Sequence, residues 1–237
     1  TTRDAGGFEY IVLDPALSQQ LKACAEASGG TLFMFLFAVF SVLLHRYSGQ
    51  RHITMGSPTA GRMRQETEPL IGFFANTLLI TASIRPEDTI FDVAATVRDS
   101  ATGAFAHDET PLELLVEALK PQRSLARNPL FQVMFILQNS RRPQLELSGF
   151  DVSLIAAGSM SVKFDMLMEF YEKDGGITGW LGYRTDLFDA VTIHRFAQNF
   201  ETLARAIVVS PQTPVGQLGF YAGGVSTAFN DDLDDAF

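Results

Sequence analysis

Residues 164–183, FDMLMEFYEKDGGITGWLGY, decide the fold class because two strand-like runs flank a turn within them. Residues 164–171 and 177–183 are rich in aromatic and aliphatic side chains, which is typical of β-strands. Between them, Lys173-Asp174-Gly175-Gly176 contains the Asp-Gly pair that favours a tight turn. The stretch therefore predicts a β-hairpin.

The sequence on both sides of this hairpin alternates between further helices and strands. After it, residues 190–209 repeat apolar side chains at helical spacing, which predicts a long amphipathic helix. Helix and strand signals mixed along a chain predict an α/β layered domain. Before the hairpin, the expected helices begin at Asp14-Pro15, Thr31, Asp88-Thr89 and Thr110-Pro111, and the strand-like runs are residues 8–13, 53–56, 73–84, 130–137 and, more weakly, 152–155.

The composition is that of a globular protein with a sizeable core. Of the 237 residues, 46% are hydrophobic and 19% are charged. The net charge is −9. Because phosphate binding needs a basic surface, this charge argues against a nucleic-acid partner.

Cysteine usage and hydropathy exclude further classes. Cys24 is the only cysteine, so an internal disulfide is impossible, and we expect a small core residue there. The longest apolar run, residues 32–44, is shorter than the about 20 residues of a membrane span and predicts a buried helix. No signal-peptide pattern follows Thr1, so we expect a cytoplasmic protein that does not associate with a membrane.

Generic catalytic motifs do not occur in the sequence. It has no glycine-rich phosphate loop, no nucleophile elbow and no paired metal ligands. His45, His52, His107 and His194 are scattered, and we expect a structural role for each. These patterns therefore predict neither a catalytic residue nor a metal site.

Four stretches, however, resemble motifs of the condensation domains of nonribosomal peptide synthetases, in the order of that family. IGFFANTL at residues 71–78 resembles the fifth core motif, I-G-x-F-V-N-T, and SLARNPLFQ at residues 124–132 resembles the seventh, R-D-x-S-R-N-P-L-F-Q. HDETPLE at residues 107–113 is a looser match to the sixth, and GSPTAGR at residues 56–62 resembles the G-x-P-x-A-G-R stretch before them. Residues 128–132 are the most specific part.

The resemblance implies a fold and a division of the chain. Condensation domains resemble two chloramphenicol-acetyltransferase-like lobes that face each other across a tunnel. The sequence begins where the second lobe should begin, so residues 1–218 are expected to form the C-terminal lobe, a mixed β-sheet with helices packed on it. Residues 219–237 are expected to form a flexible acidic tail.

The sequence also departs from the family pattern. The H-H-x-x-x-D-G motif of the first lobe is missing, since no two histidines are adjacent in the chain. In the seventh motif, Arg123-Ser124 replaces Arg-Asp, and Ala126 replaces the serine before the second arginine. The resemblance therefore implies half of a condensation domain, inactive without its first lobe.

The reaction of the family is amide formation between two thioesters carried on phosphopantetheine arms. The amine of the acceptor attacks the thioester carbonyl of the donor, which requires near-attack positioning and stabilisation of an oxyanion. No cofactor is therefore expected to bind the chain directly. The implied partners are the first lobe and the donor and acceptor carrier proteins.

Two polar residues are candidates for the wall of the substrate tunnel. Ser57 lies at a switch from strand to loop, where its hydroxyl can face substrate or cap the Ser-Pro turn. Asn76 lies in a strand between apolar residues, so its amide needs partners in the tunnel or, as the favoured alternative, in the backbone of the lobe.

The remaining motif residues are expected to hold the fold. A guanidinium such as that of Arg62 or Arg127 can bind loop carbonyls or a carboxylate such as Asp165. Asp165 can instead pair with its neighbour Lys163 or cap the floor of the tunnel. The full set of expected structural residues is Gly72, Thr77, Arg62, Arg127, Asn128, Pro129, Gln132 and Asp165.

The tail suggests a separate interaction. It either docks on a basic surface of a neighbouring synthetase subunit or stays disordered without a partner. The candidate docking residues are Asp231, Asp232, Leu233, Asp234, Asp235 and Phe237.

Three functions thus stay open: half of a peptide-bond-forming acyltransferase, a non-catalytic platform that docks carrier proteins or subunits, and half of a heterocyclisation or epimerisation domain. Residues 128–132 favour condensation or heterocyclisation over epimerisation. Neither the two substrates nor the stereochemical preference is predicted, because the tunnel needs both lobes.

Overall fold

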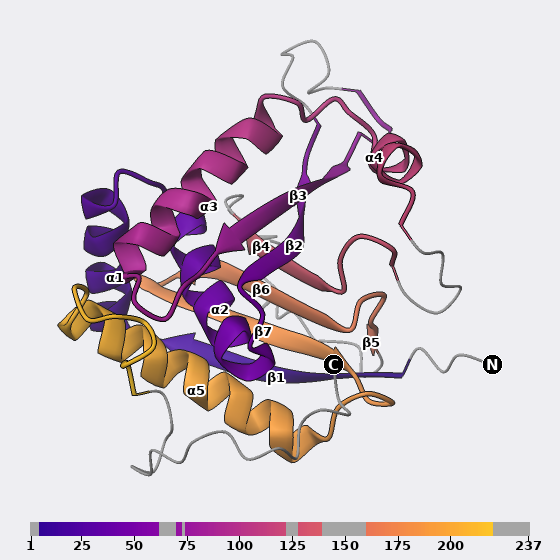
Figure 1. Ribbon diagram of the computed structural model, residues 1–237. Helices are drawn as coiled ribbons and strands as arrows, with labels where there is room; N and C mark the ends of the chain where they lie inside the picture. Colours follow the sequence, from indigo (N-terminus) through magenta and orange to yellow (C-terminus); the bar gives the residue numbers. More distant parts are fainter. Residues whose placement is uncertain (1–4, 62–69, 73, 122–127, 139–159, 220–237) are drawn as a thin grey trace, which may run out of the picture.

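The computed structural model describes residues 5–61, 70–72, 74–121, 128–138 and 160–219. In this part of the chain, helices pack on one mixed β-sheet with the strand order β3-β2-β4-β6-β7-β1-β5 (Figure 1). The arrangement confirms the predicted α/β class. The strands are β1 (Ala5–Leu13), β2 (His52–Thr59), β3 (Asn76–Ser83), β4 (Val133–Gln138), β5 (Met160–Ser161), β6 (Met166–Lys173) and β7 (Gly176–Arg184), and the helices are α1 (Pro15–Ala27), α2 (Leu32–Ser48), α3 (Ile90–Phe105), α4 (Leu112–Leu119) and α5 (Ala190–Val209).

The predicted hairpin lies near the centre of this sheet. β6 and β7 pair antiparallel along their whole length. The turn residues Asp174 and Gly175 both have positive φ, 51° and 80°. A two-residue turn of this kind matches the right-handed twist of the strands. β4 then pairs parallel to β6, and β1 pairs antiparallel to β7.

Helix α2 is the buried helix that the apolar run predicts. The Thr31 hydroxyl accepts a hydrogen bond from the Met34 N–H at 3.3 Å, and Gly49, at φ 68°, ends the helix in the left-handed conformation. Every residue from Phe35 to His45 is buried. Because α2 contacts α1, α3 and α5 on one side and β2 and β4 on the other, it forms the centre of the helix layer.

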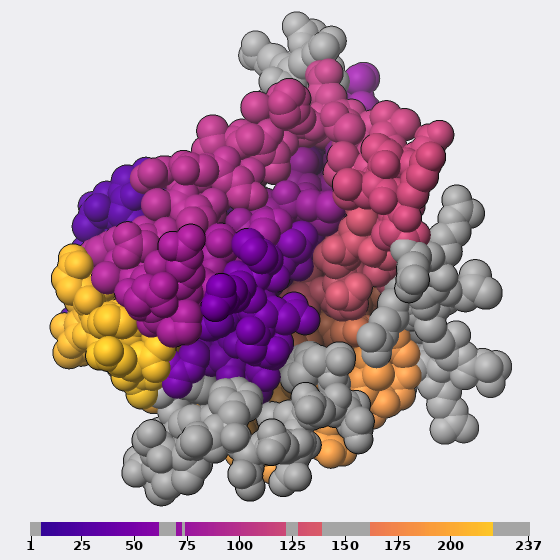
Figure 2. All heavy atoms as spheres, in the orientation of Figure 1, coloured from indigo at the N-terminus to yellow at the C-terminus, as the bar shows by residue number. Residues whose placement is uncertain are grey.

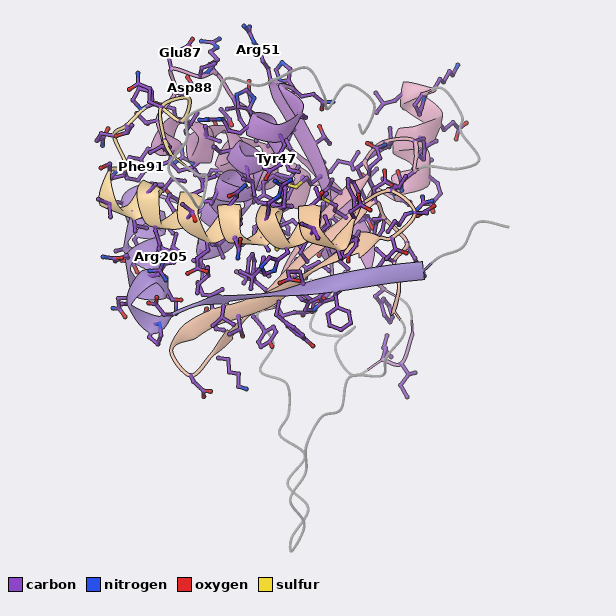
Figure 3. The ribbon with its side chains drawn as sticks, turned by 90° about the horizontal axis from the view of Figure 1, so that it is seen from below. Tyr47, Arg51, Glu87, Asp88, Phe91 and Arg205 are labelled. Atoms are coloured by element: carbon purple, nitrogen blue, oxygen red, sulfur yellow. The ribbon has the colours of Figure 1, made fainter. Side chains whose placement is uncertain are left out.

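The helix layer covers one face of the sheet. α3 packs on β3, α1 packs on β7, and α5 packs on β1 and β7, as the view in Figure 3 shows for α5 and β1. Along β1, Ile11 and Leu13 are buried, whereas Phe8, Tyr10 and Val12 are exposed. This alternation places the first pair toward the helices and the other three on the opposite face.

No single helix of the described ranges is long and apolar enough to cross a membrane. Helices α1 and α2 would qualify only as a pair, and they meet at a bend of 101°. Since residues 35–45 of α2 are buried in the core, the hydropathy of this helix is explained by packing.

After α5, the chain returns to the helix layer and is held there. The Val215 N–H donates to the Asp88 carbonyl at 2.8 Å, and Arg46 Nη1 donates to the Val215 carbonyl at 2.7 Å. The side chains of Val215 and Leu218 are buried. The division of the chain after residue 218 stays a prediction, because residues 220–237, with all the candidate docking residues, lie outside the described ranges.

Candidate functional site

The described parts of the four motif stretches are joined to one another by direct contacts. The first contact joins residues 56–61 to the stretch around Phe74. Gly61 has φ +61°, and a Cβ added to it would lie 1.9 Å from the carbonyl oxygen of Phe74. A side chain at this position would therefore clash with backbone as well as strain the left-handed conformation.

Asn76 joins the IGFFANTL stretch to the HDETPLE stretch. Its Nδ2 donates to the carbonyls of Asp108 and Thr110, at 2.8 and 2.7 Å, and its Oδ1 accepts from the Thr77 N–H at 2.8 Å. Both hydrogens of the amide and its oxygen are thus engaged within the described part of the chain. This bonding favours backbone support, the second of the two roles predicted for Asn76, over direct contact with substrate.

Phe131 joins the NPLFQ stretch to β2. Its side chain is 2% exposed, and its ring occupies the space that a Cβ on Gly56 would need, with ring carbon Cε2 only 2.4 Å away. The preceding turn is held by Asn128, whose Oδ1 accepts from the N–H groups of Leu130 and Phe131 at 3.1 and 3.4 Å. Gln132 Nε2 donates to the Asn128 carbonyl at 3.0 Å. These contacts support the structural roles predicted for Asn128 and Gln132.

Ser57 follows Gly56 in β2 and is 4% exposed. It pairs with Leu78 of β3 and shares a face of β2 with the buried Met55, so it points toward the helix layer. The chain as described therefore leaves Ser57 little surface for a substrate, and its place in a tunnel wall stays a prediction.

Asp165 has a partner that the sequence did not indicate. Arg184 Nη1 lies 3.5 Å from Asp165 Oδ1, and the same guanidinium donates to both carboxylate oxygens of Asp186, at 3.0 and 2.6 Å. The hydrogen bond from Arg184 holds the pKa of Asp186 below its usual value. The partners expected for Asp165, Arg62 and Arg127, lie outside the described residues.

A buried carboxylate lies in the turn between α3 and α4. Asp108 is 9% exposed, and its Oδ2 has no hydrogen-bond partner among the described residues. Buried polar atoms without a partner are rare in folded proteins. Asp108 lies in the HDETPLE stretch, but its burial could not be predicted from the sequence, because burial of one carboxylate in a turn depends on the packing of the whole chain around it.

Apolar side chains are exposed beside the joined motifs. Ile71 is fully exposed and Leu70 is 51% exposed. α4, drawn in pink at the right edge in Figure 2, has no residue that the described part of the chain buries, and it exposes Leu114 and Leu119. Exposed apolar surface of this kind is typical of contact with another protein surface.

No group of three or more metal-binding side chains occurs in the described ranges. Two of the scattered histidines have hydrogen-bond partners that fit a structural role. His45 Nδ1 lies 2.6 Å from the Gln50 carbonyl at the end of α2, and His194 Nδ1 lies 2.8 Å from Glu9 Oε1 across the contact of α5 with β1.

The family model of the condensation domain matches residues 5–223. Tyrocidine synthase 3 of Brevibacillus parabrevis is 39% identical over 203 residues, which are 86% of this chain and 3% of that protein. Malpibaldin synthetase of Mortierella alpina is 37% identical over 210 residues, 89% of this chain and 4% of that protein. The chain therefore spans only a small part of these curated relatives.

Solved structures share this fold. The X-domain from teicoplanin biosynthesis superposes with a TM-score of 0.83 at 24% identity, over 91% of this chain and 50% of that chain. The first condensation domain of the calcium-dependent antibiotic synthetase gives 0.73 at 21%, over 91% and 48%. These likenesses confirm the predicted mixed sheet with helices packed on it, and the match over residues 5–223 shows that the chain belongs to the condensation domain family of nonribosomal peptide synthetases.

Proposed function

We propose that the chain is the C-terminal lobe of a peptide-bond-forming condensation domain and works only together with a first lobe that carries the H-H-x-x-x-D-G motif. The extent of the structural match supports this proposal, because 91% of the chain superposes on only 48% of a solved condensation domain. In addition, no two histidines are adjacent in the sequence.

In this proposal the lobe supplies one wall of the channel in which the two thioesters meet. The contacts of Gly61, Asn76 and Phe131 join the motif stretches into one unit inside the lobe. Such a unit suits a reaction whose main demand is positional, since the amine and the thioester carbonyl must be held at near-attack distance. The first lobe would supply the histidine that positions the amine or relays its proton.

The partners of the proposed domain are the first lobe and the donor and acceptor carrier proteins, whose phosphopantetheine arms bring the substrates. The exposed side chains of Leu70, Ile71 and α4 support a contact with another protein surface. Such an assembly works in the cytoplasm and needs no cofactor bound to this lobe.

The test supplies the first lobe to the purified chain, together with donor and acceptor carrier proteins that carry their thioesters. Amide formation is followed by intact-protein mass spectrometry of the acceptor carrier. We expect product only when both lobes are present, and none when the second histidine of the first lobe is replaced by alanine. Product formation by the 237-residue chain alone would contradict the proposal.

A non-catalytic docking platform is the second candidate, and the exposed apolar surface beside the motifs is the observation that favours it. A platform binds the carrier protein without ever producing the amide. Sequencing the coding DNA upstream of Thr1 gives a first discrimination, since an H-H-x-x-x-D-G motif in frame supports catalysis shared between two lobes.

Heterocyclisation is distinguished in the same assay, because its product is lighter than the simple amide by one water. The NPLFQ stretch favours condensation or heterocyclisation over epimerisation.

For the tail, we propose docking on a neighbouring synthetase subunit. Deleting residues 228–237 tests this role, and unchanged affinity for that subunit would contradict it.

A further inference from the structure

Gln132, Asp165 and Arg184 lie side by side across three neighbouring strands. The ladder of β4 with β6 begins at the pair Val133–Met166, and the ladder of β6 with β7 begins at the pair Met166–Tyr183. Gln132, Asp165 and Arg184 each lie one position beyond these pairs, at the same end of the three strands. The Asp165 N–H donates to the Gln132 carbonyl at 2.9 Å, and the Arg184 N–H donates to the Asp165 carbonyl at 3.2 Å.

The Arg184 side chain adds a charged contact to this row. It is 14% exposed and the Asp165 side chain is 16% exposed, so water screens the 3.5 Å ion pair less than it screens an exposed pair. The two hydrogen bonds to Asp186 hold the guanidinium plane in place.

Asp165 is in turn connected to the most specific motif stretch of the chain. Its neighbour Phe164 stacks on Phe131, with ring centroids 5.3 Å apart and an interplanar angle of 29°. Phe131 lies against Gly56 of β2. A shift of Asp165 would therefore move both Phe164 and the strand-start carbonyl of Gln132.

We propose that Arg184 is a positioning residue: through Asp165 it holds residues 128–132 against β2. The effect on local structure follows from the contacts alone, whereas the effect on amide formation rests on the proposed function. The two effects are therefore measured separately.

Hydrogen–deuterium exchange of the purified chain measures the local effect. We expect R184Q to accelerate exchange of the Leu130 and Phe131 amides about tenfold while exchange of α2 stays unchanged. R184K keeps a positive charge beside Asp165 and should restore most of the protection. R205Q is the matched control, because Arg205 also bridges two carboxylates, Asp14 and Glu201, at the contact of α5 with α1 (Figure 3).

Two outcomes of this experiment would overturn the local effect. One is unchanged exchange of residues 130–131 in R184Q. The other is an equal acceleration throughout the chain, which would mean global destabilisation. If R184K exchanges as fast as R184Q, charge pairing with Asp165 is not the basis of the positioning.

Amide formation by the chain together with its first lobe measures the catalytic effect. We expect R184Q to lower kcat about tenfold with less than about a twofold change in KM, and R184K to recover most of the rate. An unchanged kcat in R184Q overturns the catalytic part. If the wild-type pair of lobes forms no amide, the proposed function fails, whereas the exchange result still decides the positioning of residues 128–132.

Discussion

Single glycines allow the close approach of the motif stretches, and the closest of these approaches is at Gly61. Two costs coincide there, a φ of +61° and a backbone oxygen 1.9 Å from any Cβ. Gly49 has a similar φ of +68°, but apart from its immediate chain neighbours no residue of the described ranges lies within 4 Å of its Cβ position. Comparing substitutions at Gly49 and Gly61 therefore separates the energetic cost of conformational strain from that of steric clash.

We expect Gly61→Ala to lower the free energy of unfolding by about 2 kcal/mol or more, because the alanine is strained and the Phe74 carbonyl must move. Gly49→Ala should cost about 1 kcal/mol, since it meets the strain alone. Urea unfolding of both variants measures the difference. Equal losses in the two variants would contradict a role for the close approach.

Cys24 illustrates a residue whose chemistry is suppressed by its surroundings. Burial raises the pKa of its thiol above the ordinary 9.0, so little thiolate is present at neutral pH. We expect Cys24 of the folded chain to react with iodoacetamide at about pH 7.5 about tenfold more slowly than a free thiol, and faster as the pH rises. The rate in urea is the control, and reaction at or above the free-thiol rate in the folded state would contradict burial of this thiol.

At the scale of elements, the start of α3 shows how local sequence builds a helix end. Thr89 accepts from the Asp92 N–H, and Asp92 accepts in return from the Thr89 N–H and hydroxyl, which together form a capping box. Hydrogen bonds from the Thr89 side chain and then its backbone hold the pKa of Asp92 below the ordinary 3.8.

We expect Thr89→Ala to lower the free energy of unfolding by about 1 kcal/mol at neutral pH. Because the pKa of Asp92 is lowered in the folded state, its part of the stabilisation is present above pH 3.8 and is lost as the pH falls through the folded pKa. The difference between variant and wild type should therefore shrink below pH 3.8. Thr102→Ala, on the exposed side of α3, is the control and should change stability by less than about 0.5 kcal/mol.

Elements with a strong local signal could be predicted from the sequence, and α5 has the predicted bounds. β2 was predicted as residues 53–56 but runs from His52 to Thr59. Pro58 makes the second half look unlike a strand. In the fold, β2 pairs with β4 only at Gly56, so Pro58 pairs with Thr77 of β3 on one side and with no described strand on the other. Proline is tolerated at such an edge position, because it has no N–H to donate to a second strand.

Contacts that depend on strand order could not be predicted in the same way. The pairing of Asp165 with Arg184 needs the register of β6 on β7, and the approach of Phe131 to Gly56 needs β4 to lie beside β2. Phe131 and Gly56 lie far apart in the sequence, whereas Asp165 and Arg184 are 19 residues apart on the two arms of the predicted hairpin. The motif resemblance identified the segments, whereas only the fold shows which of their atoms meet.

At the scale of the molecule, the segment after α5 packs back against the helix layer. Residues 211–218 return to the helix layer, where Arg46 bonds the carbonyls of Val215 and Leu218 at 2.7 and 3.4 Å. The Gly216 N–H also donates to the Pro86 carbonyl at 2.9 Å. The helix layer is thus bonded to residues that follow its last helix.

Two truncations test whether the folded part of the chain ends after residue 218. Removal of residues 211–237 exposes the sites of Val215 and Leu218, which are 0% and 4% exposed, and should lower the free energy of unfolding by about 3 kcal/mol or more. Removal of residues 220–237 leaves these contacts in place and should change it by less than about 0.5 kcal/mol. Both are measured by urea unfolding with the full chain as reference. A large loss on removing only residues 220–237 would mean that the acidic tail contributes to the folded structure, and its proposed docking role would then have to compete with a structural one.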